Sequence, residues 1–383
     1  MNTGEAREVF KSYAAALAYV EVESPTGDLS IGTAFHVGEG VFVTARHVVE
    51  GKKVVEVGST ESVHIPLTGA EAVNATTFLY VNDERMAVHW VRNGVMRIES
   101  GPYLHSDERV DVAVFKVHAI DPRTPVIPLG SHLDDWLGGS DFVLTEAVIL
   151  GYPPIPMTTT PALVGARAEI SAQVDLYETP YVHFVLSATA RGGFSGGVAF
   201  SEYGFALGMV TRSLLAGEGS VESGYMAVLA VEPIYECLAW HRMLPDCQAE
   251  MWDGLWNTSE FSFSSDEPVS GEPSRVTAQI AIFDDGKTCG MTITCGDGCS
   301  DRDNIFPEML RVARSRLSNI YFSFSLMRLG YCKIDFKGNY SEVAPRVYAA
   351  AQSVGALLVR RGYFPLGFAD ESDIRPESGL DFA

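Results

Sequence analysis

Short strand-like runs separated by turn residues occupy the chain from about residue 17 to residue 232. Apolar, β-branched and aromatic residues predominate in each run, and Gly, Pro, Asn or Asp stands between one run and the next. Many short strands with little helix between them indicate a β-sandwich or β-barrels. The predicted strands are 18–23, 32–36, 41–44, 53–57, 112–117, 143–150, 168–174, 182–186, 196–200, 205–210 and 224–229, and a closing helix is predicted at 233–240.

The composition changes after residue 246. Polar residues and two prolines characterise the end of the segment 247–275, which is typical of a linker. Aromatic residues lie in the same segment, so we expect part of it to pack against a domain. These aromatic residues are Trp252, Trp256, Phe261 and Phe263.

A second pattern of strands and helices begins near residue 276. An Asp-Asp-Gly sequence at 284–286 between two apolar runs predicts a hairpin of strands 278–283 and 288–294. Further elements are predicted as a helix at 306–317, strands at 320–326 and 331–336, and a long helix at 342–360. We therefore predict three parts: a domain at 1–246 with a short N-terminal helix at 4–16, a linker at 247–275, and a small α+β domain at 276–383.

The charge and the apolar runs exclude several classes of protein. The formal net charge is −21, so a general nucleic-acid surface, which needs clustered Lys and Arg, is not expected. No apolar run reaches the roughly 18 residues of a membrane span, and no membrane association is expected. Glu5 and Glu8 stand where a signal peptide would carry positive charge. The six cysteines all follow residue 236, which favours reduced thiols and a cytoplasmic protein.

The cysteines near the C-terminus raise the question of a metal site. Zinc sites are usually built from Cys-x₂-Cys pairs and histidines, but no such pair is present and no histidine follows His241. The aspartates at 297, 301 and 303 resemble a calcium loop only faintly, because its Gly and closing Glu are misplaced. We therefore expect no metal and no cofactor, and we interpret the four C-terminal cysteines as free thiols: Cys289, Cys295, Cys299 and Cys332.

A serine lies between paired glycines in the sequence R-G-G-F-S-G-G at 191–197. Glycine tolerates unusual dihedral angles and lets the backbone approach a ligand closely. Two backbone N–H groups in such a turn can point to one place beside Ser195, as an oxyanion hole requires. A tight loop between strands has the same composition, so this motif alone does not establish a function.

Two further residues change the interpretation of the serine turn. His47 follows an apolar strand at 41–44, and Asp111 immediately precedes another at 112–117. Each residue by itself is more often a core histidine or a turn aspartate. The chain order His, Asp, Ser fits two successive β-barrels, in which the first supplies His47 and Asp111 and the second supplies Ser195.

These motifs resemble those of trypsin-like serine peptidases, with the bacterial HtrA-like and V8-like branches most similar. T-A-R-H at 44–47 resembles the histidine motif of the family, D-V-A-V at 111–114 its aspartate motif, and G-F-S-G-G at 193–197 its nucleophile motif. G-Y-P at 151–153 and G-Y-M-A-V at 224–228 are similar to two segments of the second barrel. The resemblance implies a mainly β fold of two six-stranded barrels over residues 17–245.

The resemblance also implies roles for individual residues. Ser195 is expected to be the nucleophile, His47 the general base and Asp111 the residue that orients the imidazole. The N–H groups of Gly193 and Ser195 are expected to bind the oxyanion. Position 194 departs from the family, since Phe replaces the usual Asp or Asn. Phe194 cannot pair with a freed N-terminal amine, and it leaves open whether the oxyanion hole is preformed.

The expected substrate is a protein or peptide. By the resemblance, Thr189 lies near the floor of the S1 pocket, and Thr211, Arg212 and Met226 lie near its walls. The absence of an acidic residue at 189 argues against strict Arg or Lys preference; an apolar residue is expected, or an acidic one because of Arg212.

The expected function is that of an intracellular bacterial serine endopeptidase. A protein partner is expected to regulate it through residues 276–383, in a setting such as defence or stress. The alternatives are a catalytically silent or latent trypsin-like scaffold that binds a partner, and an exported V8-like protease.

Overall fold

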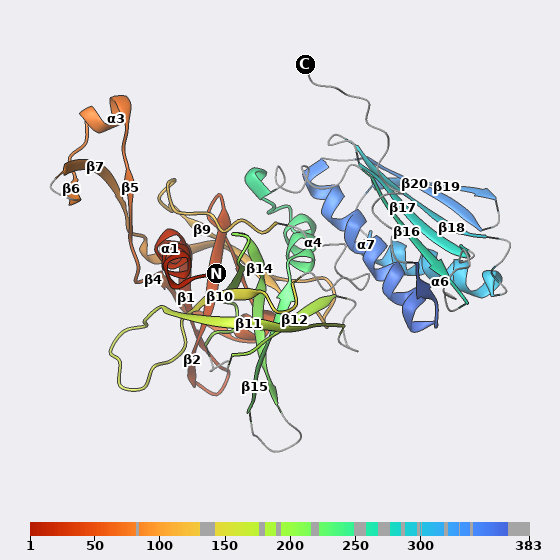
Figure 1. The fold of residues 1–383 in the computed structure, drawn as a ribbon, viewed down its shortest axis with the longest axis horizontal. Coiled ribbons are helices and arrows are strands. Elements are labelled where there is room, and N and C mark those ends of the chain that lie inside the picture. Colours follow the sequence, from red (N-terminus) through yellow and green to blue (C-terminus); the bar gives the residue numbers. More distant parts are fainter. Residues whose placement is uncertain are drawn as a thin grey trace. The chain divides into compact units, whose positions relative to one another are not determined.

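The structure is a computed structural model, and it divides into two compact units. The first comprises Met1–His132 and Ser140–Trp252, and the second is formed mainly by Asp253–Ala383 (Figure 1). The residues described are 1–81, 84–130, 142–175, 181–188, 193–215, 222–248, 258–266, 276–284, 288–296, 299, 301–317, 321–328, 330–337 and 340–366.

The first unit begins with a closed barrel of six strands in the order β1-β2-β3-β9-β8-β4. Adjacent strands are antiparallel, and the register pairs Ala34 with Thr44 and Thr44 with Ala113. All four residues of β3 are buried, so the side chains on both faces of this strand are covered. The strands are β1 (Leu17–Glu23), β2 (Leu29–Gly38), β3 (Val41–Thr44), β4 (Lys53–Ser59), β8 (Gly94–Leu104) and β9 (Ala113–His118).

A second closed barrel follows, in the order β10-β11-β12-β15-β14-β13. Helix α1 (Thr3–Tyr13) packs on this barrel, where the ring of Tyr13 stacks on Phe200 at a centroid distance of 4.7 Å. The two six-stranded barrels confirm the predicted fold class. The strands are β10 (Glu146–Gly151), β11 (Val164–Asp175), β12 (Val182–Leu186), β13 (Val198–Ser201), β14 (Ala206–Leu215) and β15 (Glu222–Ala230), and helix α4 (Glu232–Trp240) closes the domain.

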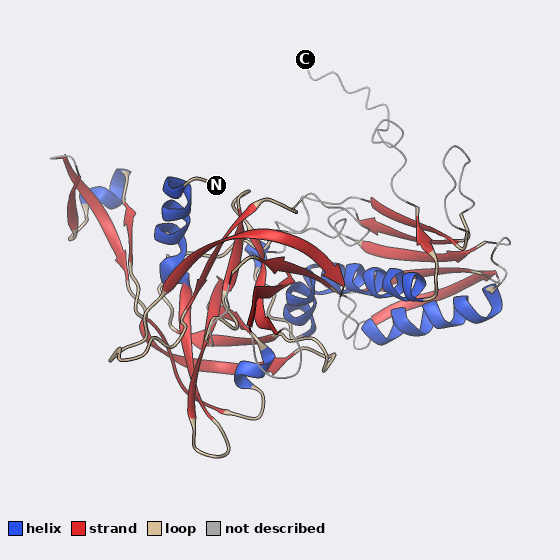
Figure 2. Cartoon of the chain, turned by 60° about the horizontal axis from the view of Figure 1, so that its bottom comes forward, coloured by secondary structure: helices blue, strands red, loops and turns tan. Residues whose placement is uncertain are grey.

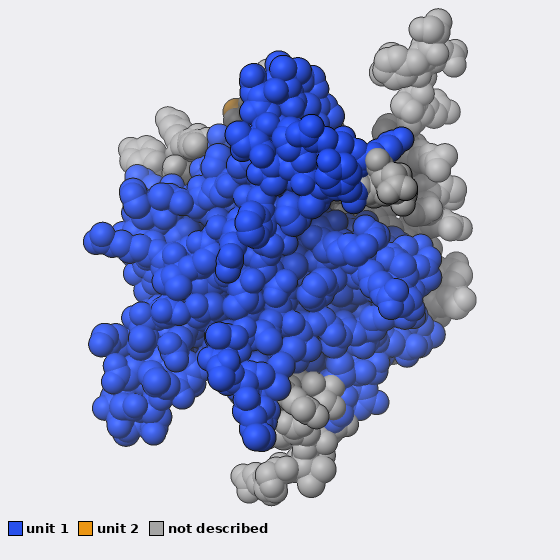
Figure 3. Space-filling model, turned by 90° about the vertical axis from the view of Figure 1, so that its left-hand side faces the viewer, with its two compact units in different colours: residues 1–132, 140–252 blue, residues 133–139, 253–383 orange. Residues whose placement is uncertain are grey.

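An insertion between β4 and β8 projects from the first barrel (Figure 1). It contains β5 (Val63–Pro66), α3 (Gly69–Val73), β6 (Phe78–Val81) and β7 (Glu84–Val91), whose strands form a sheet in the order β5-β7-β6. Figure 3 shows the first unit from the side on which the insertion lies. No strand was predicted between residues 57 and 112. Exposed and buried apolar side chains are mixed here: Val73 is 84% exposed, whereas Val88 and Val91 are buried.

The second unit is a six-stranded sheet in the order β19-β20-β18-β17-β16-β21. Helices α6 (Arg302–Arg316) and α7 (Tyr340–Arg360) contact each other and the central strands of the sheet (Figure 2). This agrees with a small α+β domain. The strands are β16 (Thr258–Ser264), β17 (Ala278–Asp284), β18 (Cys289–Cys295), β19 (Tyr321–Arg328), β20 (Tyr331–Lys337) and β21 (Phe364–Pro365).

Strand β16 lies inside the segment 247–275 that was predicted to be a linker. It pairs antiparallel with β17, and the side chains of Phe261 and Phe263 are buried. Ser and Glu alternate with these two rings, so the composition resembled a linker although one face of the strand belongs to the core. The prediction of a linker was therefore wrong for residues 258–264.

No helix in the described part of the chain is long and apolar enough to cross a bilayer.

Candidate active site

Ser195 lies in a turn between β12 and β13 that only glycine allows at two positions. Gly193 and Gly196 have φ angles of 93° and 82°, which side chains disfavour. The surroundings are also closed. A Cβ on Gly196 would lie 2.0 Å from the carbonyl oxygen of Thr33, and one on Gly193 would lie 2.6 Å from that of Tyr152. The paired glycines therefore let the turn pack tightly against both barrels.

His47 and Asp111 form a hydrogen-bonded pair at the end of the first barrel. His47 lies in the short helix α2 (Arg46–Val49) after β3, and Asp111 precedes β9. The Asp111 carboxylate accepts the backbone N–H of His47 at 2.9 Å and contacts Nδ1 of its ring at 2.7 Å. A carboxylate can only accept, so Nδ1 carries the proton. The neutral ring then has a free lone pair on Nε2, as a general base requires.

The Ser195 hydroxyl is directed to the second barrel. Its Oγ donates a hydrogen bond to the carbonyl oxygen of Thr211 on β14 at 3.2 Å. Both His47 and Ser195 belong to the described residues, and no hydrogen bond joins Oγ to the imidazole in this conformation. Catalytic hydrogen bonds are often loose without substrate. In this conformation the Ser195 hydroxyl is therefore bonded to Thr211 and not to His47.

The backbone around Ser195 presents two donors that are not engaged. Within the described chain, the N–H groups of Gly193 and Ser195 donate to no other group. The Phe194 side chain is buried, and a Cβ on Gly151 would lie 2.9 Å from Cδ1 of its ring. The carbonyl oxygen of Phe194 accepts the N–H of Gly197 at 2.7 Å. The Phe194 side chain thus packs beside β10. The N–H groups of Gly193 and Ser195 are left available to bind an anion.

The loop that leads to Asp111 is fixed by a buried polar network. The Arg46 guanidinium donates to the carbonyl oxygens of His105 and Asp107 at 3.3 and 3.4 Å. The N–H of Asp107 donates to Nδ1 of His105 at 3.0 Å, so Nε2 carries the ring proton and faces the Glu236 carboxylate at 3.2 Å. Both side chains are fully buried. Arg46, the residue before His47, is thereby hydrogen-bonded to the segment that leads to Asp111.

The residues predicted to form the substrate pocket are placed as follows. Thr211 and Met226 are buried on the neighbouring strands β14 and β15, while Arg212 is exposed on β14. Thr189 lies outside the described residues. His183, a buried histidine on β12, was not predicted to be a site residue. Burial lowers its pKa to about 4, and the charge of Arg212 also lowers it.

The C-terminal cysteines form no metal centre among the residues that the structure describes. There, no group of three or more His, Cys, Asp or Glu side chains is placed to bind an ion. All six cysteines of the chain are free thiols. The sulfur of Cys299 lies 2.9 Å from the Tyr363 hydroxyl, and burial raises the pKa of the Cys295 thiol to about 12. The Cys295 thiol is therefore a weak ligand and a weak nucleophile at neutral pH.

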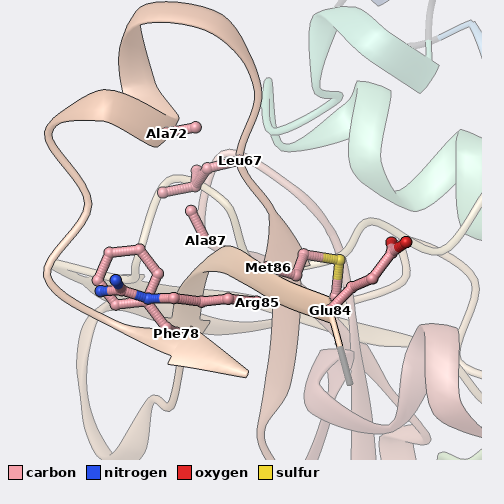
Figure 4. Close-up of a pocket in the computed structure, with 7 residues that line it drawn as sticks. All are labelled: Leu67, Ala72, Phe78, Glu84, Arg85, Met86 and Ala87. Carbon is pink, nitrogen blue, oxygen red and sulfur yellow. The ribbon is translucent and has the colours of Figure 1, made fainter. Parts of the chain in front are cut away.

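A cavity of about 680 Å³ lies on the insertion (Figure 4). The Arg85 guanidinium covers the ring of Phe78, 3.5 Å from its centroid. Of the two charged side chains that line the cavity, Glu84 and Arg85, the arginine therefore already has a partner. None of the three predicted catalytic residues contributes to the cavity. Its lining consists of Leu67, Ala72, Phe78, Glu84, Arg85, Met86 and Ala87.

Thr33 was not predicted to be a site residue. It is fully buried on β2 and hydrogen-bonds to the Ser195 turn of the other barrel. The contact joins residues that are far apart in the sequence, so a pattern within one strand could not reveal it.

The match to a family model agrees with the two-barrel fold. Residues 32–209, which include His47, Asp111 and Ser195, match the family model of the trypsin-like peptidase domain. No curated protein sequence matches the chain. The active form of the Rv3671c protease from M. tuberculosis is 18% identical with a TM-score of 0.40, over 62% of this chain and 86% of that one. A serine endoprotease from Yersinia pestis is 15% identical with a TM-score of 0.36, over 71% and 74%.

Proposed function

Because residues 32–209 match the trypsin-like peptidase domain, we propose that the chain is a trypsin-like serine peptidase that cleaves peptide bonds within proteins through a triad of Ser195, His47 and Asp111. The observation that carries this assignment is the double hydrogen bond of Asp111 to His47, to its backbone N–H and to Nδ1. This arrangement sets the ring orientation and the tautomer together, which is what a general base needs.

In the proposed reaction, Ser195 Oγ turns from the Thr211 carbonyl to His47 Nε2 and attacks the carbonyl carbon of the peptide bond. Nε2 takes the hydroxyl proton, and Asp111 stabilises the imidazolium. The oxyanion accepts hydrogen bonds from the N–H groups of Gly193 and Ser195. The imidazolium then protonates the leaving amine, and water hydrolyses the acyl-enzyme by the same proton route.

The substrate class that we propose is a protein or peptide, with Thr211, Arg212 and Met226 near the residue that precedes the cleaved bond. The apolar side chain of Met226 supports an apolar residue there, and the exposed Arg212 supports an acidic one instead. Cleavage of a peptide library decides between these, since replacing Arg212→Ala should affect only an acidic preference.

We also propose that the enzyme is cytoplasmic and bacterial, and that a protein partner regulates it through residues 276–383. An endopeptidase among cellular proteins needs restraint, and the second compact unit offers a surface for a regulatory partner. Detection in the soluble cell fraction supports a cytoplasmic enzyme; accumulation in the medium contradicts it.

The Ser195–Thr211 hydrogen bond supports a latent enzyme as the second candidate function.

A fluorophosphonate probe tests the proposed triad. The purified full-length protein is expected to be labelled, and Ser195→Ala and His47→Ala are expected to abolish labelling. Ser201→Ala is the matched control, because Ser201 is a buried serine of the same barrel whose Oγ contacts the Phe205 carbonyl. Labelling that survives in Ser195→Ala would contradict the assignment. Labelling that appears only after addition of cell lysate would favour the latent enzyme.

A further inference from the structure

Thr33 connects the nucleophile turn to the first barrel through two hydrogen bonds. Its backbone N–H donates to the carbonyl oxygen of Ser195 at 2.9 Å, and its Oγ1 donates to the carbonyl oxygen of Gly193 at 2.7 Å. These two acceptors lie on either side of Phe194. One threonine of β2 therefore fixes both ends of the three-residue segment that carries the proposed oxyanion donors.

The position of Thr33 is itself fixed from both barrels. The hydroxyl of Thr44 on β3 donates to its carbonyl oxygen at 2.7 Å. The N–H of Tyr152, which follows β10 of the second barrel, donates to its Oγ1 at 2.8 Å. The Thr33 hydroxyl thus donates and accepts at once, and its side chain has no exposed surface. A buried hydroxyl with both functions satisfied leaves little freedom to move.

The same contact explains the close packing at Gly196. The Thr33 carbonyl oxygen occupies the space that a Cβ of Gly196 would need, and the Oγ1 of Thr44 lies 2.6 Å from that position. The N–H of Gly196 donates to the Val210 carbonyl at 2.8 Å. The turn is therefore enclosed between β2 and β14, so a displacement of Thr33 would be transmitted to Ser195.

We propose that Thr33 is a positioning residue of the peptidase: its hydroxyl binds the Gly193 carbonyl and so fixes the Gly193–Phe194 peptide plane, which lies between the two proposed oxyanion donors, the N–H groups of Gly193 and Ser195. The proposal rests on the proposed function of Ser195. Gly193 has no Cβ to restrict its ψ angle, so the peptide plane that follows it needs an external partner. The buried Phe194 ring packs beside Gly151 and offers no hydrogen-bond donor, so the hydrogen bond to the Gly193 carbonyl comes from Thr33.

The proposal predicts a loss of rate without a loss of fold. Thr33→Val keeps the β-branched shape and the backbone N–H but removes the hydroxyl. A displacement of about 1 Å in a catalytic group can cost on the order of 100-fold, and one lost oxyanion donor costs roughly 100- to 1000-fold. We expect the second-order rate of fluorophosphonate labelling to fall about 100-fold in this variant. Thr33→Ser keeps the hydroxyl and should stay within about 3-fold of the wild type.

Fluorophosphonate labelling reports on the oxyanion site directly. Ser195 Oγ forms a bond to phosphorus, fluoride leaves with the electron pair of the broken P–F bond, and His47 takes the hydroxyl proton. The phosphoryl oxygen occupies the place of the oxyanion, so its stabilisation depends on the two amides. Thr124→Val is the matched control. Thr124 is a buried threonine of the first unit whose hydroxyl contacts Asn93 at 3.0 Å, and its loss should leave labelling unchanged.

Three results would overturn the proposal. The first is equal labelling of folded Thr33→Val and wild type, and the second is an equal loss in Thr124→Val. If Thr33→Val does not fold, Thr33→Cys keeps the volume with a weaker hydrogen-bonding group, and unchanged labelling of this variant would be the third. An unlabelled wild type contradicts the proposed function instead. Hydrogen exchange then tests the role of Thr33 without labelling. The proposal requires the amides of Gly196 and Gly197 to exchange faster in Thr33→Val than in the wild type, and equal rates would overturn it.

Discussion

Gly196 and Gly204 have similar backbone angles but different surroundings. Their φ values are 82° and 92°, so both lie in the region that side chains disfavour. The Cβ position of Gly196 is 2.0 Å from the Thr33 carbonyl oxygen, whereas that of Gly204 has no atom within 4 Å. Replacing each glycine by alanine therefore separates two losses of stability. The change at Gly204 measures the backbone strain of a side chain alone, and the change at Gly196 measures this strain together with the steric clash against Thr33.

We expect Gly204→Ala to lower the free energy of unfolding of the first unit by about 1–2 kcal/mol, the usual cost of a left-handed conformation. Gly196→Ala should add overpacking of about 1–3 kcal/mol and reduce fluorophosphonate labelling, because Ser195 precedes it. Urea unfolding of both variants measures the difference. Equal losses of stability would show that the turn can move away from Thr33, contrary to the proposal.

The orientation of His47 by Asp111 gives a prediction for catalysis. Asn at position 111 can donate as well as accept, so the ring can adopt the tautomer that is protonated on Nε2 and unable to act as a base. We expect Asp111→Asn to lower kcat about 10⁴-fold, measured on a cleaved peptide. Asp121→Asn is the control, because Asp121 also binds a histidine, His89, at 2.9 Å in the same unit. A similar loss in both variants would contradict a specific role.

At the scale of elements, the sequence predicted the strands of both barrels except β8, which it missed, and it predicted none of the insertion. Strands such as β3, with four buried residues, have continuous apolar runs that identify them. In β7, residues 86–91 are apolar apart from His89, but their burial does not alternate: the adjacent Ala87 and Val88 are both buried, while Trp90 is exposed. The catalytic motifs were local and could be recognised, but the contact of Thr33 with Gly193 spans 160 positions and required the fold.

Strand β16 provides the test of the second unit. Phe263 is fully buried and pairs with Ala278 of β17, so Phe263→Ala should cost about 3–5 kcal/mol through the cavity that it leaves. Phe283 of β17 is 46% exposed, and Phe283→Ala should change stability by less than about 1 kcal/mol. Hydrogen exchange of the β17 and β18 amides measures both effects. A minor effect of Phe263→Ala would mean that β16 acts as a linker.

At the scale of the molecule, buried histidines link the stability of the peptidase unit to pH. His183 is buried on β12, and its Nδ1 contacts the Tyr181 carbonyl at 3.1 Å. Its pKa is lowered from 6.5 to about 4, first by burial and then by the charge of Arg212, while the Tyr181 carbonyl and Asp111 oppose the shift. Burial also lowers the pKa of His36 in the first barrel. Both side chains are therefore neutral when the protein is folded at neutral pH.

We expect the unit to lose stability as the pH falls from about 6.5 to about 4. In this window the unfolded chain binds a proton at His183 that the folded chain does not, so each step toward acid favours unfolding. The shift corresponds to about 3 kcal/mol for this one residue. His183→Gln removes the titrating group and should flatten the urea-unfolding profile by that amount. His118→Gln, at an exposed position on β9, should not, and parallel profiles for wild type and His183→Gln would refute the linkage.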